Sequence, residues 1–187
     1  MLRYLTAGES HGKALVAILE GIPAGVKIDS ARINSELKRR QQGIGRGARM
    51  QIEHDKGQIL SGLKKGITLG SPIVLLIENK DFSIEKLPSV TCPRPGHADL
   101  PGILKYGFTD CRNVLERASA RETASRVGIG AICKIFLSEF KIKISSMVLS
   151  VAGEPGLESM IKKINEARDK KDTVGGIFEV TARGVPC

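Results

Sequence analysis

The sequence predicts an α+β fold in a single domain over residues 1–187. Short apolar runs typical of strands alternate loosely with amphipathic segments typical of helices. Gly and Pro separate these runs at short intervals, and no long linker, low-complexity segment or internal repeat divides the chain. With 187 residues, of which 41% are hydrophobic, the chain has enough apolar sequence for a core.

The N-terminal segment predicts two strands and a helix. Leu2 to Thr6 reads as a strand that leads into a loop over Gly8 to Gly12, and Leu15 to Leu19 reads as a second strand, with a short helix as the alternative. A helix is expected from Asp29 and Ser30 to about Arg40, because Asp and Ser favour helix starts. Cations in its last turn complement the helix dipole, and the basic run continues on glycine-rich backbone over residues 43–49.

The middle of the chain predicts a hairpin, a buried strand and a long irregular loop. Met50 to His54 is expected to pair with Gln58 to Ser61 across a turn at residues 55–57. The apolar run Pro72 to Glu78 follows as a buried strand. Pro, Ser and Gly are dense from Phe82 to Asp99, which indicates an irregular loop of the kind that often carries function.

The C-terminal third predicts a long central helix and a strand–helix–strand unit. The helix covers Ala120 to Phe140, and close backbone packing is the expected reason for Gly128 and Gly130 within it. A strand over residues 142–151, a helix over 156–171 and a strand over 177–182 complete the expected elements.

The net charge predicts an anionic partner. Lys and Arg outnumber Asp and Glu by 29 to 20, which gives a net charge of +9. No Trp, two Tyr and five Phe provide few stacking surfaces, so phosphorylated small molecules are favoured over nucleic acid. No apolar run is long enough for a membrane span and the start lacks a signal-type segment, so we expect a cytoplasmic protein. The cysteines lack metal-ligand or redox spacing, and we assign them no metal and no function: Cys92, Cys111, Cys133 and Cys187.

Two of the three histidines lie in short segments suited to proton transfer. In Gly8-Glu9-Ser10-His11-Gly12, Ser10 and His11 can offer a hydroxyl and an imidazole to a phosphate oxygen, although a solvated polar turn is the alternative. Arg94-Pro95-Gly96-His97-Ala98-Asp99 combines a cation, a turn, an imidazole and a carboxylate, with an exposed turn and a local ion pair as the alternative. His54 has no such neighbours and is interpreted as structural, on a strand.

A third segment, Arg117-Ala118-Ser119, directly precedes the central helix. Ser119 is placed to cap that helix, whose first amides suit a phosphate or an electron-rich ring edge. Arg121 adds a positive charge. In the alternative, Arg121 and Arg126 are solvated and pair with Glu116 or Glu122 at helical spacing.

These three segments, with the continuation over residues 20–25, closely resemble chorismate synthase along the whole length of the sequence. The resemblance implies a layer of helices between antiparallel sheets, and a homotetramer. It implies elimination of phosphate from 5-enolpyruvylshikimate 3-phosphate to give chorismate, with reduced FMN as cofactor and NADPH as a possible source of flavin reduction.

The resemblance also implies roles for individual residues. His11 would be the acid toward the leaving phosphate, and His97 the proton donor to reduced flavin. The flavin would contact residues 117–119, although Ala118 stands where some relatives carry Ser. The remaining implied contacts fall into two groups: Arg40 and Arg46 for cofactor, and Ser10, Arg46 and Arg121 for substrate.

Chorismate synthases continue well beyond the point where this sequence stops. The resemblance therefore implies that an aspartate acting with the flavin, and much of the flavin-binding surface, lie outside these residues. We expect the residues named above to form at most half of an active site. A non-catalytic basic module that binds phosphorylated ligands or nucleic acid is the alternative function, and steep salt dependence of binding would distinguish it.

Overall fold

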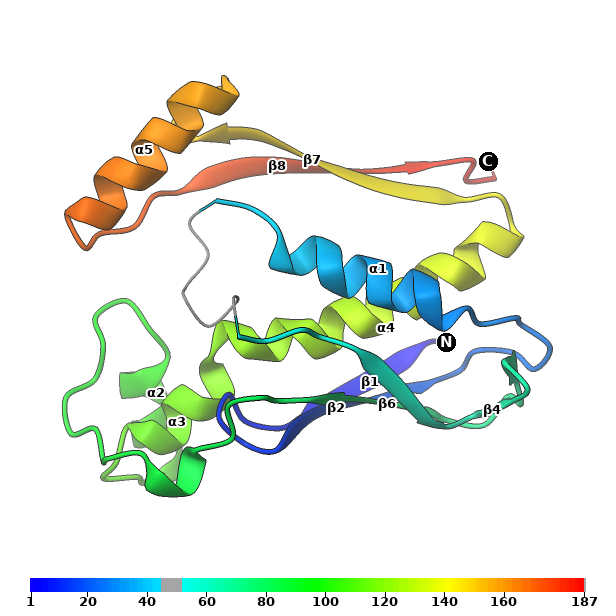
Figure 1. Ribbon diagram of the computed structural model, residues 1–187, viewed down its shortest axis with the longest axis horizontal. Coiled ribbons are helices and arrows are strands. Elements are labelled where there is room, and N and C mark those ends of the chain that lie inside the picture. Colours follow the sequence, from blue (N-terminus) through cyan, green and yellow to red (C-terminus); the bar gives the residue numbers. More distant parts are fainter. Residues whose placement is uncertain (45–51, 187) are drawn as a thin grey trace.

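The computed structural model describes residues 1–44 and 52–186. These residues form three layers, in which two long helices lie between a four-stranded sheet and a long two-stranded hairpin (Figure 1). Every strand pairing is antiparallel. The predicted α+β class and the predicted layer of helices between antiparallel sheets are confirmed.

The four-stranded sheet has the order β1-β2-β6-β3. Its strands are β1 (Arg3–Ala7), β2 (Ala14–Glu20), β6 (Ile73–Glu78) and β3 (Gly57–Ser61). Every second side chain of β2 and β6 is buried, which gives the sheet one apolar face. The strands expected near residues 2–6, 15–19 and 72–78 are confirmed.

Two helices cover that apolar face. Helix α1 (Ser30–Gln41) begins as expected, since the Asp29 side chain accepts a hydrogen bond of 2.8 Å from the amide of Ala31. Helix α4 (Thr123–Glu139) follows a single 3₁₀ turn, η3 (Ala120–Glu122), so the predicted central helix is confirmed with a 3₁₀ start. The helices and the sheet together enclose one core cluster, which includes Leu15, Leu37, Leu75, Ile132 and Ile135.

The third layer is a ribbon of β7 (Lys143–Val151) paired with β8 (Gly176–Arg183), and α5 (Leu157–Asp169), which connects them in sequence, lies at one end of this hairpin (Figure 1). All three predicted elements are confirmed. The hairpin exposes several large apolar side chains, among them Met147, Val148, Ile177, Phe178 and Val180.

The remaining elements are short. A small ladder joins β4 (Leu63–Lys64) to β5 (Ile67–Thr68), and a 3₁₀ turn, η2 (Ile84–Lys86), lies in the predicted irregular loop. Helices α2 (Asp99–Tyr106) and α3 (Arg112–Ala118) pack beside each other at one end of the sheet (Figure 1). Sequence reasoning predicted neither helix.

The predicted hairpin over residues 50–61 is wrong. Residues 57–61 do form a strand, but it pairs with β6, and residues 52–56 form no strand. Strand β3 pairs with the edge of β6 that β2 does not occupy, so β3 needs no partner from the residues just before it in the sequence. His54 is therefore exposed on irregular backbone rather than on a strand, while residues 50 and 51 lie outside the described part.

The two central glycines of α4 differ in their surroundings. A Cβ atom at Gly128 would lie 2.3 Å from Cδ2 of Leu75, so the absence of a side chain lets the helix approach the sheet. At Gly130 a Cβ atom would meet nothing within 4 Å, so close packing does not explain that glycine. The predicted reason is confirmed for one of the two positions.

Gly128→Ala is expected to lower the free energy of unfolding by about 1–3 kcal/mol, because the fully buried Leu75 cannot move aside without strain. Gly130→Ala on the same helix is the matched control. Its added methyl group meets open space, so we expect unchanged stability or a gain of up to about 1 kcal/mol. Urea unfolding followed by circular dichroism measures both, and an equal loss in the two variants would contradict this account.

Candidate active site

One asparagine binds the loop that carries His11. The side-chain Nδ2 of Asn79, at the end of β6, donates to the carbonyl oxygens of Glu9, Ser10 and Gly12 at 3.2, 3.1 and 2.7 Å. Its main-chain amide donates to the carbonyl of Lys13 at 3.0 Å. The loop starts at Gly8, where φ is +101° and a Cβ atom would lie 2.4 Å from a backbone oxygen. The loop thus needs a glycine at its start and an amide beneath it.

Glu116 on α3 holds the same loop from the side. Its carboxylate oxygens lie 2.9 and 3.0 Å from Nδ1 of His11, and one of them accepts a 2.8 Å hydrogen bond from the His11 main-chain amide. The Glu116 carbonyl accepts another from the amide of Ser10 at 2.9 Å. Arg112, one turn earlier on α3, places its guanidinium 3.6 Å from the carboxylate.

The open side of His11 faces Asp81. Its Oδ2 lies 3.7 Å from Nε2 of His11, and 22% of the histidine side chain is exposed. The carbonyl of His11 accepts a 3.0 Å hydrogen bond from the amide of Ile84 in η2. Both ring nitrogens of His11 therefore face carboxylates, one buried and one partly exposed.

The second histidine lies in a local cluster before α2. The fully buried Asp99 accepts two hydrogen bonds of 2.8 Å from the Arg94 guanidinium and one of 3.0 Å from the Arg94 amide. The same guanidinium lies 2.9 Å from Nδ1 of His97. Hydrogen bonding from Arg94 keeps the pKa of the Asp99 carboxyl well below its ordinary value, and it raises the pKa of Arg94.

The loop before His97 is attached to α3. The Asp110 carboxylate accepts 2.8 Å hydrogen bonds from the amides of Val90 and Arg112, and these bonds lower the pKa of Asp110. The Arg112 side chain donates to the carbonyl of Pro88 at 2.7 Å. Because α3 also binds His11 and packs on α2, the structure brings both predicted histidine segments to the same two-helix unit.

Two of the predicted binding arginines are buried in an ion cluster beneath the site. Nη1 of Arg121 donates to Asp55 at 2.6 Å, its Nε donates to Asn79 at 2.8 Å, and its Nη2 lies 3.6 Å from the Glu53 carboxylate. Arg40 lies 3.5 Å from Asp55 and donates to the hydroxyl and carbonyl oxygens at the start of α4. Arg121 is 4% exposed and is therefore not on a solvated helix face.

The segment 117–119 connects α3 to the start of the central helix. The guanidinium of Arg117 donates to the carbonyl and hydroxyl oxygens of Thr6 at 2.8 Å each. The Ser119 hydroxyl accepts from the amide of Arg121, so it caps η3 as the sequence predicted. The solvated alternative holds for Arg126, which pairs with Glu122 at 2.9 Å.

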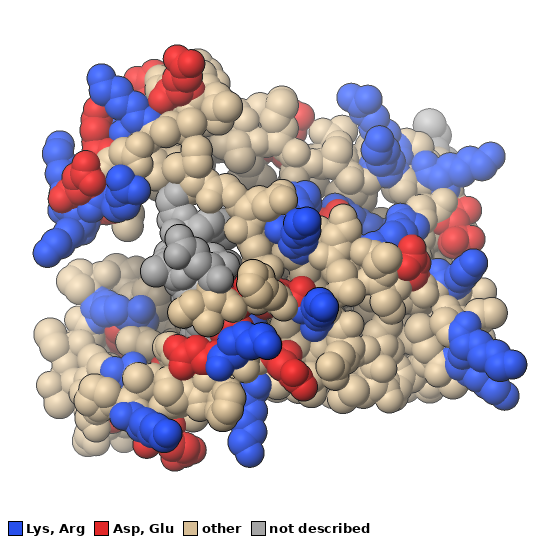
Figure 2. Space-filling model, in the orientation of Figure 1, with Lys and Arg blue, Asp and Glu red and all other residues tan. Residues whose placement is uncertain are grey.

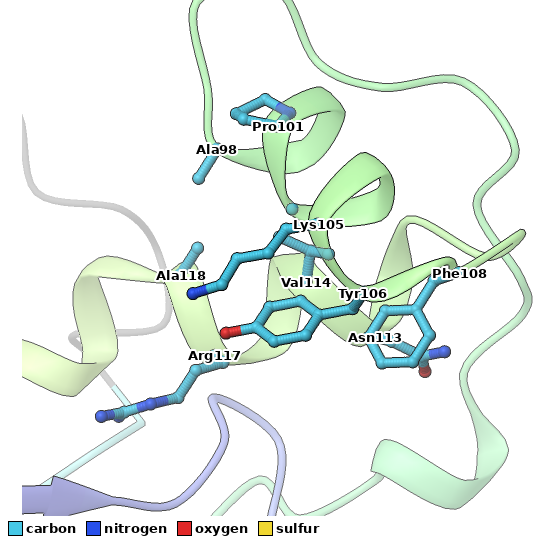
Figure 3. A pocket seen from close by; sticks show the side chains of 10 residues that line it. Ala98, Pro101, Lys105, Tyr106, Phe108, Asn113, Val114, Arg117 and Ala118 are labelled. Carbon is cyan, nitrogen blue, oxygen red and sulfur yellow. The ribbon is translucent and has the colours of Figure 1, made fainter.

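A pocket of about 320 Å³ lies between α2 and α3 beside this segment (Figure 3). Its wall is mostly apolar, and it contains Ala98, which follows His97, and Ala118. Figure 3 shows Lys105 extending along the pocket beside Tyr106, and its Nζ lies 4.9 Å from the centre of that ring. The pocket is lined by Ala98, Pro101, Gly102, Lys105, Tyr106, Phe108, Asn113, Val114, Arg117 and Ala118.

The predicted roles of the site residues stay predictions. Arg46, predicted for both cofactor and substrate, lies outside the described residues. Ser10 is buried at 3% exposure, with its main chain bound to Glu116 and Asn79. Sequence reasoning missed Asn79 as a site residue and considered Glu116 only as a helical ion-pair partner. The i,i+4 spacing of Arg112 and Glu116 was the only local signal for the glutamate.

On the face of the molecule drawn in Figure 2, the positive charge is spread out. On the face in Figure 2, Lys and Arg side chains lie over several elements, intermixed with acidic groups, and form no continuous stripe. No helix among residues 1–44 and 52–186 is long and apolar enough to cross a membrane.

Comparison with known proteins identifies one family. The sequence profile of the family described as chorismate synthase matches residues 2–187. A chorismate synthase from Thermoanaerobacter pseudethanolicus is 53% identical over 188 residues, covering 99% of this chain and 54% of the relative. One from Aquifex aeolicus is 48% identical over 232 aligned residues, covering 99% of this chain and 58% of the relative.

A solved structure is similar as well. A chain described as the crystal structure of chorismate synthase matches with a TM-score of 0.79 and 42% sequence identity. The match covers 99% of this chain and 59% of that chain. The present chain thus spans about half the length of the relatives that it matches.

The low pKa of Asp99 predicts a pH-dependent contribution to stability. Because folding lowers this pKa, the contribution is present above the ordinary carboxyl pKa of about 4 and is lost as the pH falls through the folded value. Asp99→Asn should therefore be less stable than wild type at pH 7, and the difference should shrink below about pH 4. Asp169→Asn, at a side chain 74% exposed, is the control. Urea midpoints measured from pH 7 to 3 would contradict this if the difference between wild type and Asp99→Asn did not change with pH.

Proposed function

The chain belongs to the chorismate synthase family, and we propose that its residues contribute to a site that eliminates phosphate from 5-enolpyruvylshikimate 3-phosphate to give chorismate. The observation that carries the proposal is the attachment of both predicted histidines to one two-helix unit by buried carboxylates. Fixed imidazoles at a shared site suit proton transfer to a leaving group and to a cofactor.

The hydrogen bonds of His97 support its role as a proton donor. An arginine cannot accept a hydrogen bond, so the 2.9 Å contact with Arg94, closer than the Asp99 carboxylate at 3.3 Å, favours a lone pair on Nδ1 of His97. The neutral ring then carries its proton on Nε2. Asp99 holds Arg94 in place, and 35% of the histidine side chain is exposed, so that proton can reach a ligand.

The pocket between α2 and α3 fits one edge of a flavin. Its apolar wall suits a flat aromatic ring, and the Lys105 ammonium suits the phosphate of FMN. We propose that Ala98, Tyr106, Val114 and Ala118 hold reduced FMN there. Reduced flavin, when bound, lends electron density transiently to the elimination without net oxidation or reduction.

The substrate's anionic groups would meet the arginines of this region. The predicted contact of Arg121 with substrate would use Nη2, which makes no hydrogen bond among the described residues and lies 3.6 Å from the Glu53 carboxylate. Arg40 pairs with Asp55 and donates to the carbonyl of Ala120. Its predicted role in cofactor binding would therefore be exerted together with the other charges of the ion cluster. Arg46 remains a proposed ligand of both substrate and cofactor.

The family also supports proposals about the assembled protein. We propose a homotetramer in the cytoplasm, with NADPH as a possible source of electrons for the flavin. The spread of positive charge in Figure 2 supports small anionic ligands rather than nucleic acid.

Replacing either histidine by alanine is expected to lower turnover by roughly 10²-fold or more, with a smaller effect on substrate binding. The assay uses the present residues joined to the C-terminal remainder of the Thermoanaerobacter relative, with reduced FMN and single-turnover detection of chorismate. His54→Ala is the matched control, because this exposed histidine lies on irregular backbone. Near-normal single-turnover rates in His11→Ala or His97→Ala would remove that residue from the mechanism.

The 187-residue chain alone is expected to give no chorismate with reduced flavin and substrate, since it spans about half the length of its relatives. The joined protein is expected to be active under the same conditions. Turnover by the mass-verified 187-residue chain, above a flavin-only control, would place the whole site within these residues. Binding that falls steeply with salt and does not distinguish substrate from other phosphate esters would favour the basic binding module instead.

A further inference from the structure

A single residue of α3 holds Ser10 and His11 by three contacts. The Glu116 main chain binds the amide of Ser10, and its carboxylate binds both the main-chain amide and the ring of His11. The Glu116 side chain is 1% exposed, so its carboxylate is shielded from a ligand at the surface. Glu116 is therefore placed to act on chemistry only through His11.

The carboxylate determines which ring nitrogen of His11 carries the proton. An ionised carboxylate only accepts hydrogen bonds, and both of its oxygens lie within 3.0 Å of Nδ1. A lone pair on Nδ1 would face two further lone-pair atoms at that distance, whereas an N–H group there forms a charge-assisted hydrogen bond. The neutral ring thus holds its proton on Nδ1, and Nε2 keeps a lone pair.

The other histidine has the opposite arrangement. At Nδ1 of His97 the Arg94 guanidinium, at 2.9 Å, lies closer than the Asp99 carboxylate, at 3.3 Å, which favours a lone pair on Nδ1 and a proton on Nε2 of the neutral ring. The two rings therefore present opposite atoms to the site: a lone pair on Nε2 of His11, and an N–H group on Nε2 of His97. Around His11 the charged groups are Glu116 and Asp81 on its two nitrogens and Arg112 behind the glutamate.

We propose that Glu116 is a positioning residue that fixes His11 in the Nδ1–H tautomer, so that Nε2 is the atom that exchanges a proton with the bound ligand. The role of Glu116 in turnover rests on the proposed function, but the assignment of the His11 tautomer does not. Nε2 takes a proton when the ring is charged and delivers that same proton to the leaving oxygen, while the Nδ1 proton stays on Glu116. Asp81, 3.7 Å from Nε2, lies on the side where the exchange occurs.

The tautomer can be measured directly, because the chain has only three histidines. Two-bond ¹H–¹⁵N correlation spectra of the ¹⁵N-histidine-labelled 187-residue chain, recorded at a pH where the rings are neutral, distinguish the tautomers. We expect Nδ1–H at His11 and Nε2–H at His97. An Nε2–H tautomer at His11 in the wild-type protein would overturn the proposal without any variant.

Glu116→Gln is expected to invert the tautomer of His11. Its single amide oxygen is needed by the His11 main-chain amide, so the NH₂ group turns toward Nδ1 and favours a lone pair there. Glu122→Gln is the matched control, because that glutamate binds Thr6 and Arg126 and does not contact His11. Inversion in Glu116→Gln alone supports the proposal. An unchanged His11 tautomer in Glu116→Gln, or inversion in Glu122→Gln, would overturn it. If Glu116→Gln does not fold, the wild-type spectrum decides.

A kinetic measurement then separates positioning from binding. In the joined synthase, Glu116→Gln should lower kcat by roughly 10²-fold while KM stays within about threefold, because the wrong nitrogen carries the proton. A rise in KM with unchanged kcat would overturn the positioning role. If the joined wild-type protein makes no chorismate, the proposed function fails, and the spectra still test the tautomer.

Discussion

The side-chain amide of Asn79 is the interaction on which the site depends. It donates to three carbonyls of the His11 loop and accepts a hydrogen bond from Arg121, and it is only 5% exposed. A buried polar group without its partners costs about 1–3 kcal/mol, so the loop and the ion cluster each stabilise the other through this one amide. An apolar residue at this position would remove the side-chain donor from the carbonyls of Glu9, Ser10 and Gly12.

The ion cluster next to the His11 loop also restricts which residues can be replaced without loss of stability. Among the residues that the structure describes, the two cations Arg40 and Arg121 lie against the two carboxylates Glu53 and Asp55. Removing one partner of such a buried set commonly costs about 3–5 kcal/mol, because the others remain charged and desolvated. The cluster joins the end of α1 to η3, just before α4. Through Asn79 it also contacts the residue that binds the His11 loop.

Local sequence patterns predicted most of the strands and helices. Contacts between residues far apart in the sequence determine how the strands pair and how the site is assembled, and these could not be predicted. The alternation of Ile73, Leu75 and Ile77 is visible over a few residues, and β6 was predicted. The pairing of β3 with β6 was not predicted, because the pattern of a strand does not specify which sheet edge the strand joins. Helix α2 was missed because it has only eight residues and includes Pro101 and Gly102, residues that usually indicate a turn or loop. The histidine segments were found from their composition, whereas the contact of Glu116 with His11 spans 105 residues and leaves no periodic signal.

That separation of 105 residues has a consequence for biosynthesis. At about 5–20 residues per second, roughly 5–20 s pass between the synthesis of His11 and that of Glu116. Strand β1 precedes His11, and strands β2, β3 and β6 and the Asn79 amide are made within that interval, so all four strands and the amide that binds the loop are made before Glu116. The ring of His11 acquires its orientation only when α3 arrives. A nascent chain halted before residue 116 would carry these strands without Glu116 and without α4, which covers their apolar face, so translation order places the completion of the core and the orientation of the histidine together, after the strands.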